Sequence, residues 1–190
     1  MSDWTTIKLT QARQVAALMG DAAELPADDT PVRAHYQALR DANAGGREAL
    51  AFLGHALPRM EAIAWAARLL DDDSRGRALA RPDRQALDHV LRWLGEPDDS
   101  HRRAAHEAAE QAGERSPERM LAMAVFLSGG SLSLPDLPPV LPPPEAAVRM
   151  ATGAVTMAAY RSGAPEAYFD RALLLAEAVA EQGLRAIAPA

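Results

Sequence analysis

Three residues near the first third of the chain combine the side chains of a catalytic or recognition site. His55 can act as a base near neutral pH, Arg59 supplies a permanent cation and Glu61 supplies a carboxylate. They lie within two helical turns, so one short segment can carry all three into one pocket. The commoner use is internal: His55 then hydrogen-bonds a neighbouring carbonyl at a helix junction, and Glu61 pairs with Arg59, Arg68 or His55. Both interpretations stay open at this point.

The remaining acidic and histidine clusters do not predict a metal site. His101 and His106 are five positions apart, which turns them roughly 140° from one another on a helix. His106 and Glu110 share a helix face, but the second histidine of a metalloprotease motif is missing. The run 71–73 is three aspartates without the alternating spacing of a calcium loop. We expect it to end a helix as a hydrated acidic turn.

Nucleophilic and cofactor chemistry also lack a recognisable motif. The chain has no cysteine, which excludes a disulfide, a thiolate nucleophile and a cysteine zinc site. Ser128, Ser131 and Ser133 follow no nucleophile-elbow pattern. The Ser-Gly-Gly-Ser run at 128–131 lacks the lysine and the following helix of a phosphate loop. The sequence therefore predicts a protein that is not an enzyme and that carries no cofactor.

The charge balance limits the classes of partner. The formal net charge is −6, whereas nucleic-acid binding proteins usually present a basic footprint. A nucleic-acid site would have to use Arg102, Arg103, Arg115 and Arg119, and we predict no nucleic-acid partner. The first residues do not form a secretory signal, and no run approaches 18 apolar residues. The expected partner is thus not a membrane, and the expected location is the cytoplasm.

The pattern of residues predicts an all-α fold. Alanine, leucine and arginine dominate, aromatic residues make up 5% of the chain, and β-branched runs are rare. Trp65 and Trp93 fall on apolar helical stripes and are expected in the core. We predict a single helical domain over 1–190, built as an irregular bundle of about eight or nine short helices. The expected helices are about 10–19, 30–42, 47–57, 58–70, 83–94, 99–112, 116–127, 144–161 and 165–184.

Two segments stand outside this bundle. Residues 128–144 are rich in glycine and serine and then in proline, which forbids helix and favours extended backbone. The segment also carries Leu134, Leu137 and Val140, so we expect it to lie across the helical body; the same side chains could bind a partner instead. Residues 1–9 are expected to be a frayed N-terminus, where Trp4 folds back onto the body or anchors a partner.

Two blocks of sequence resemble those of an uncharacterised bacterial family whose members are often met near type VI secretion genes. The first block is His55-Ala56-Leu57-Pro58-Arg59-Met60-Glu61-Ala62, with Trp65 close behind. The second is Met123-Ala124-Val125-Phe126-Leu127-Ser128-Gly129-Gly130-Ser131-Leu132, followed by prolines. The chain departs from the family at position 64, where alanine stands in place of a first tryptophan. The resemblance implies an accessory or adaptor role and carries over no catalytic residue.

Together these observations predict a non-catalytic protein-interaction module: an adaptor, chaperone or accessory protein of a type VI secretion system. Its partner would be another protein, either a secretion-system component or an effector. The residues assigned to partner binding are His55, Arg59, Glu61, Leu134, Leu137 and Val140. The alternative is a helical enzyme or toxin with an unfamiliar site around the first three of these residues. No oligomeric state is predicted.

Overall fold

The computed structural model describes residues 4–20, 25–42, 46–134 and 136–187. Within these ranges the protein consists of nine packed α-helices and a short 3₁₀-helix, with no strand beyond one isolated bridge between Gln11 and Pro31. The all-α prediction is confirmed. The elements are α1 Ala12–Met19, α2 Val32–Asp41, α3 Arg47–Ala56, α4 Arg59–Arg75, α5 Arg81–Gly95, α6 Asp99–Gln111, α7 Pro117–Phe126, α8 Ala146–Arg161, α9 Pro165–Gln182 and η1 Gly183–Ile187.

Local sequence signals explain several helix starts. The Asp98 carboxylate accepts a hydrogen bond from the His101 backbone N–H at 2.7 Å and so caps α6. The Ser116 hydroxyl caps α7 by accepting from the Arg119 N–H at 3.2 Å. Proline occupies the first turn of α5, α7 and α9, where its missing N–H removes no helical hydrogen bond. These helices begin within two residues of the predicted positions.

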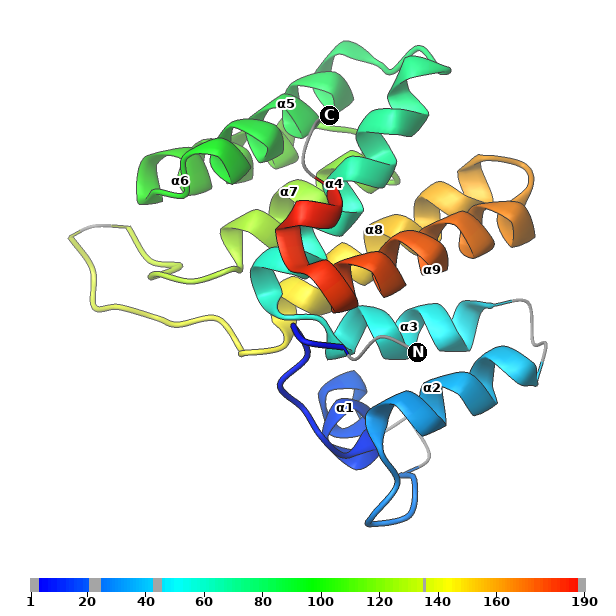
Figure 1. The fold of residues 1–190 in the computed structure, drawn as a ribbon. Helices are drawn as coiled ribbons and strands as arrows, with labels where there is room; N and C mark the ends of the chain where they lie inside the picture. The colour runs from blue at the N-terminus through cyan, green and yellow to red at the C-terminus, as the bar shows by residue number, and fades with distance from the viewer. Residues whose placement is uncertain (1–3, 21–24, 43–45, 135, 188–190) are drawn as a thin grey trace.

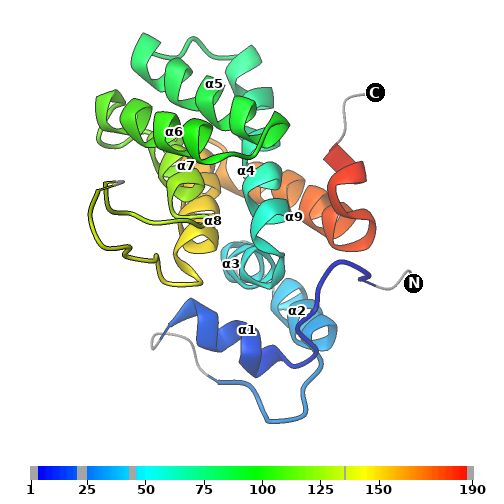
Figure 2. The same ribbon diagram turned by 90° about the vertical axis from the view of Figure 1, so that its left-hand side faces the viewer.

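Helix α4 lies at the centre of the fold and contacts α5, α7, α8, α9 and η1 (Figure 1). Helices α1–α3 form one end of the molecule, and α5 and α6 form the other (Figure 2). Trp65 of α4 is fully buried, and Trp93 of α5 is almost so, as predicted. Helix α3 packs closely on α8: a Cβ added to Gly54 would lie only 2.6 Å from the Thr152 hydroxyl. Glycine at position 54 therefore sets how closely these helices approach.

The predicted end of the fourth helix is wrong. Helix α4 continues through Asp71, Asp72 and Asp73 to Arg75. The acidic run stays helical because arginines neutralise it: Arg75 contacts Asp71 at 3.0 Å and Arg68 contacts Asp72 at 2.9 Å, each one turn away. Helices α4, α8 and α9 are the longest of the described helices, with 17, 16 and 18 residues.

The described part of the N-terminal segment folds back onto the body. The Trp4 ring packs on Tyr36 with ring centres 5.2 Å apart, and the Thr6 N–H donates to the Ala180 carbonyl at 3.1 Å. Of the two interpretations of Trp4, the fold-back is the one observed. Among the described residues, no helix is both long and apolar enough to cross a bilayer.

The proline-rich segment does not lie across the bundle. Figure 1 shows residues 128–134 extending away from the end of α7 and residues 136–144 returning to the start of α8. Leu134, Leu137 and Val140 are 68%, 57% and 55% exposed, and Leu141 is 72% exposed. The expectation that these side chains cover the helical body is therefore wrong. The reason is a set of hydrogen bonds that fixes the base of the segment.

Candidate functional site

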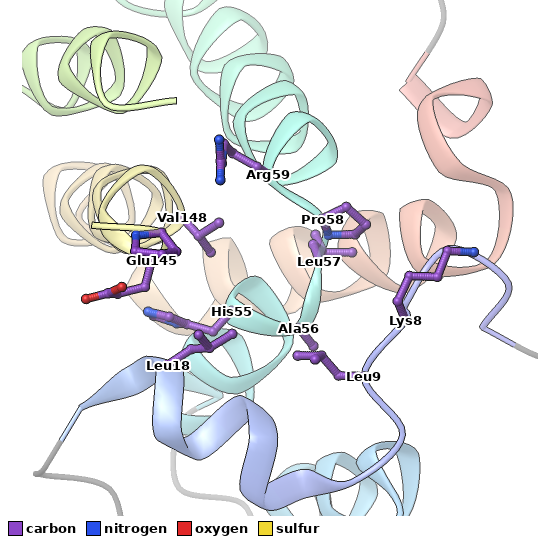
Figure 3. A pocket seen from close by; sticks show the side chains of 11 residues that line it. Lys8, Leu9, Leu18, His55, Ala56, Leu57, Pro58, Arg59, Glu145 and Val148 are labelled. Carbon is purple, nitrogen blue, oxygen red and sulfur yellow. The ribbon is translucent and has the colours of Figure 1, made fainter. Parts of the chain in front are cut away.

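A cavity of about 260 Å³ lies where the return of the proline-rich segment meets α3 (Figure 3). His55, the last but one residue of α3, and Arg59, the first residue of α4, both line it. The predicted proximity of these two residues is thus realised, because the helices meet at a two-residue turn. The complete lining is Lys8, Leu9, Leu18, His55, Ala56, Leu57, Pro58, Arg59, Pro144, Glu145 and Val148.

The carboxylate at this cavity is not the one predicted from the sequence. Glu61 is half-buried and is not among the lining residues. Glu145, which precedes α8, lines the cavity instead, and Figure 3 shows its carboxylate on the same side as the His55 ring. Its partner is Arg149, 4.0 Å away and one helical turn later. Sequence reasoning missed Glu145 because the residue lies 90 positions from His55 and joins it only through tertiary packing.

His55 is buried and neutral at ordinary pH. Its Nδ1 lies 2.7 Å from the Ala51 carbonyl oxygen, which only accepts hydrogen bonds, so Nδ1 carries the proton. This bond is the internal use that the sequence suggested. Its Nε2 is shielded from solvent and has no hydrogen-bond partner within the described residues. Burial lowers the pKa of His55, the hydrogen bond to Ala51 opposes this, and the charge of Arg149 lowers it further.

Two cations line the cavity, Arg59 and Lys8, and each donates a hydrogen bond to a backbone carbonyl. The Arg59 guanidinium donates to the Ser128 carbonyl, at the first residue of the proline-rich segment. The Lys8 ammonium donates a long bond, 3.5 Å, to the Thr5 carbonyl. Figure 3 places Lys8 on the opposite side of the cavity from Glu145. The cavity therefore has an apolar interior between the Glu145 carboxylate, which is paired with Arg149, on one side and the Lys8 ammonium on the other.

Arginines of α6 hold the base of the proline-rich segment. Arg102, whose side chain is buried, donates to the Phe126 carbonyl at 2.7 Å and to the Ser131 carbonyl at 2.9 Å. Arg103 donates to the carbonyls of Ser131 and Ser133 at 3.2 and 3.1 Å. Gly130 has a φ of +67°, and a Cβ there would lie 3.0 Å from the Arg102 guanidinium. Gly130 of the second sequence block thus permits a close approach of the backbone to Arg102.

The outer part of the segment closes on itself. The Leu132 N–H donates to the Val140 carbonyl at 2.8 Å, and the Leu137 N–H donates to the Leu134 carbonyl at 3.0 Å. These bonds turn the chain between residues 132 and 140, where a continuous extended run was expected. We call the exposed side chains of Leu134, Leu137, Val140 and Leu141 the apolar tip. Unlike a free linker, the tip is attached to a base with fixed hydrogen bonds.

The other residues considered from the sequence serve internal contacts. His106 stacks on Phe126 with ring centres 4.0 Å apart, and His101 lies 3.2 Å from Asp98. Arg119 donates to the Ala112 carbonyl at 3.2 Å. Among the described residues, no three histidine, aspartate or glutamate side chains are grouped to hold a metal ion.

The lowered pKa of His55 predicts a pH-dependent stability. An unfolded histidine binds a proton near pH 6.5, whereas folded His55 binds it only at lower pH. The unfolded state therefore gains protons first as pH falls, and the free energy of unfolding decreases below about pH 6.5. The charge of Arg149 opposes protonation of His55, and the hydrogen bond to the Ala51 carbonyl favours it, but burial has the larger effect. Urea titrations at about pH 7 and about pH 5 should show a larger loss for the wild type than for His55→Gln; equal losses would contradict the assignment.

Comparison with known proteins gives one result. No curated protein and no solved structure matches the chain. A family model matches residues 35–180, a range that includes both sequence blocks, the apolar tip and the cavity residues His55, Arg59 and Glu145, but not Lys8, Leu9 and Leu18. From the sequence we expected a family without an established function, and the match confirms that part of the expectation. The chain belongs to DUF6931, a family of unknown function.

Proposed function

We propose that the protein is a non-catalytic protein-interaction module and that the apolar tip is its contact with a partner protein. The observation that carries the proposal is the combination of exposure and anchoring. Four large apolar side chains within eight residues are each more than half exposed. Arginine side chains at the same time fix the backbone that carries them.

Scattered apolar residues on a surface need no explanation, but a contiguous group on a projecting loop does. Burial of apolar area stabilises a complex by about 25 cal/mol per Å². Ordering a loop on binding subtracts from that gain. Here Arg102 and Arg103 already order the base of the segment, so less conformational entropy is lost when a partner covers the tip.

We further propose that the partner is a component or effector of a type VI secretion system, and that this chain acts as its adaptor, chaperone or accessory protein. The support is the resemblance of the blocks at 55–62 and 123–132 to those of bacterial proteins met near such genes. The second block leads directly into the segment with the apolar tip. The interaction surface and the resembling sequence therefore adjoin one another in the chain.

Replacement of the tip should abolish partner capture without unfolding the protein. In Leu134→Ser/Leu137→Ser/Val140→Ser, the yield of cross-linked secretion-system protein from the native host should fall at least about tenfold, because the buried apolar area is lost. The melting temperature should stay unchanged, since these side chains are exposed. Quantitative mass spectrometry of cross-linked products measures the yield.

The matched control is Leu174→Ser, which removes a leucine that is 62% exposed on α9, away from the tip. This variant should capture the same partner as the wild type. Equal capture by the triple variant, or capture of no secretion-system protein by the wild type, would refute the proposal.

A further inference from the structure

We propose that the cavity lined by His55, Glu145, Lys8 and Arg59 binds an α-amino acid with an apolar side chain, either free or as the N-terminal residue of a peptide. The proposal is independent of the apolar tip and of any secretion partner. It rests on the distribution of charge around the cavity, on one buried acceptor without a partner, and on the size of the space.

The anionic side of the cavity fits an ammonium group. Glu145 supplies a carboxylate there, and neutral His55 supplies an unprotonated Nε2 that can accept a hydrogen bond. A buried acceptor without a partner costs free energy, and a donor that reaches it recovers that cost. Nε2 is shielded from solvent, so a donor reaches it only when a side chain that covers it moves aside. A primary ammonium can donate to both groups at once.

The cationic side fits a carboxylate or a peptide carbonyl. Lys8 lies across the cavity from Glu145 in Figure 3, and Arg59 lies at the end toward α4. To the residues that the structure describes, the Lys8 ammonium donates one bond, of 3.5 Å to the Thr5 carbonyl, and an ammonium has three donors, so two remain for a ligand. Opposite charges on opposite sides favour a ligand that carries both charges over one that carries either alone.

The interior and the volume limit what lies between the two charges. Leu9, Leu18, Leu57 and Val148 supply apolar walls, which favour an aliphatic side chain. The volume of about 260 Å³ lies below the roughly 300–1,000 Å³ of sites for drug-sized ligands. A single amino-acid residue is of the right size, whereas a nucleotide is too large.

Titration of the purified full chain with L-leucine by isothermal calorimetry tests the proposal. Leucine should bind at least about tenfold more tightly than 4-methylpentanoate, which lacks the ammonium, and 3-methylbutylamine, which lacks the carboxylate. Glycine, which lacks the apolar side chain, should not compete. The tripeptide Leu-Gly-Gly distinguishes the two sources: tighter binding than leucine indicates a peptide N-terminus, and weaker binding indicates the free amino acid.

Two variants test the assigned residues. His55→Phe removes the acceptor while keeping an aromatic ring, and Glu145→Gln removes the charge; each should weaken leucine binding at least about tenfold. His89→Phe is the matched control, because His89 also has a buried ring nitrogen without a partner but lies on α5, outside the cavity. Circular dichroism confirms that each variant is folded.

Three results would overturn the proposal: no binding of leucine or Leu-Gly-Gly, equal binding of 4-methylpentanoate, or unchanged binding in both folded cavity variants. None of these bears on partner capture by the apolar tip, so failure here is distinguishable from failure of the interaction proposal.

Discussion

Replacement of Arg161 by methionine is expected to destabilise the protein by about 3–5 kcal/mol, because it strands a buried carboxylate. Glu118 has 0% of its surface exposed, and its two oxygens accept from Arg161 at 2.8 and 2.7 Å. Arg161 also donates to Asp73 at 3.0 Å, and the Ser116 hydroxyl donates to Glu118 at 2.9 Å. Burial lowers the pKa of Arg161, but its bonds and attraction to Glu118 and Asp73 outweigh burial and raise it.

A double variant shows whether the loss of stability comes from the missing contact or from the buried charge that is left without a partner. Arg161→Met/Glu118→Gln removes both ions, so it should be more stable than Arg161→Met alone, as is found when buried ion pairs are replaced whole. Urea unfolding followed by circular dichroism measures all the variants. Arg171→Met is the control, because Arg171 is exposed and should lose less than about 1 kcal/mol. A similarly small loss in Arg161→Met would show that water reaches Glu118 in the folded protein.

This ion pair also shows why the sequence predicts the helices better than their contacts. The start of α7 follows from Ser116-Pro117, and its cap is formed within three residues. Glu118 in the same turn has the pattern of an exposed first-turn acid that favours the helix dipole. Its burial depends on Arg161, 43 positions away at the end of α8. Local spacing contains no record of such a partner.

The difference between local signals and distant contacts also explains why the acidic run in α4 was mispredicted. A sequence of three aspartates has low helix propensity and suggests a stop. In the structure Arg68 and Arg75 stabilise the run from its own helix, and Arg84 and Arg161 contact it from α5 and α8. The local arginines were visible in the sequence. The two distant arginines were not, and they make the acidic run a half-buried junction between α4, α5 and α8.

In the candidate site, too, the residues close in sequence were predictable and the distant one was not. His55 and Arg59 are four residues apart, so the turn at Leu57-Pro58 brings them to one cavity. Glu145 could not be assigned, because its position depends on how the proline-rich segment returns to α8. The exposure of that segment was also mispredicted. Its apolar composition suggested burial, whereas the deciding bonds run from Arg102 and Arg103 to backbone carbonyls, and carbonyls have no sequence signature.

Trp65→Ala is the second large prediction, with an expected loss of about 3–5 kcal/mol. Trp65 is fully buried at the contact of α4 with α9, and its indole N–H donates to the Ala172 carbonyl at 2.9 Å. Alanine leaves a cavity and also loses the hydrogen bond from the indole to that carbonyl. Trp65→Phe keeps most of the volume and loses the hydrogen bond, so its loss should be smaller than that of Trp65→Ala.

Urea unfolding at neutral pH compares these variants with Trp4→Ala, in which a partly exposed tryptophan is removed from its contact with Tyr36. Because the Trp4 ring is only partly buried, its removal should cost roughly 1 kcal/mol. The test is the order of the three losses in unfolding free energy. The largest loss for Trp65→Ala indicates that Trp65 serves the core and not recognition of a partner. If Trp65→Ala cost no more than Trp4→Ala, α4 and α9 would not be held together by this side chain. Trp65, which follows the first sequence block, would then need another explanation.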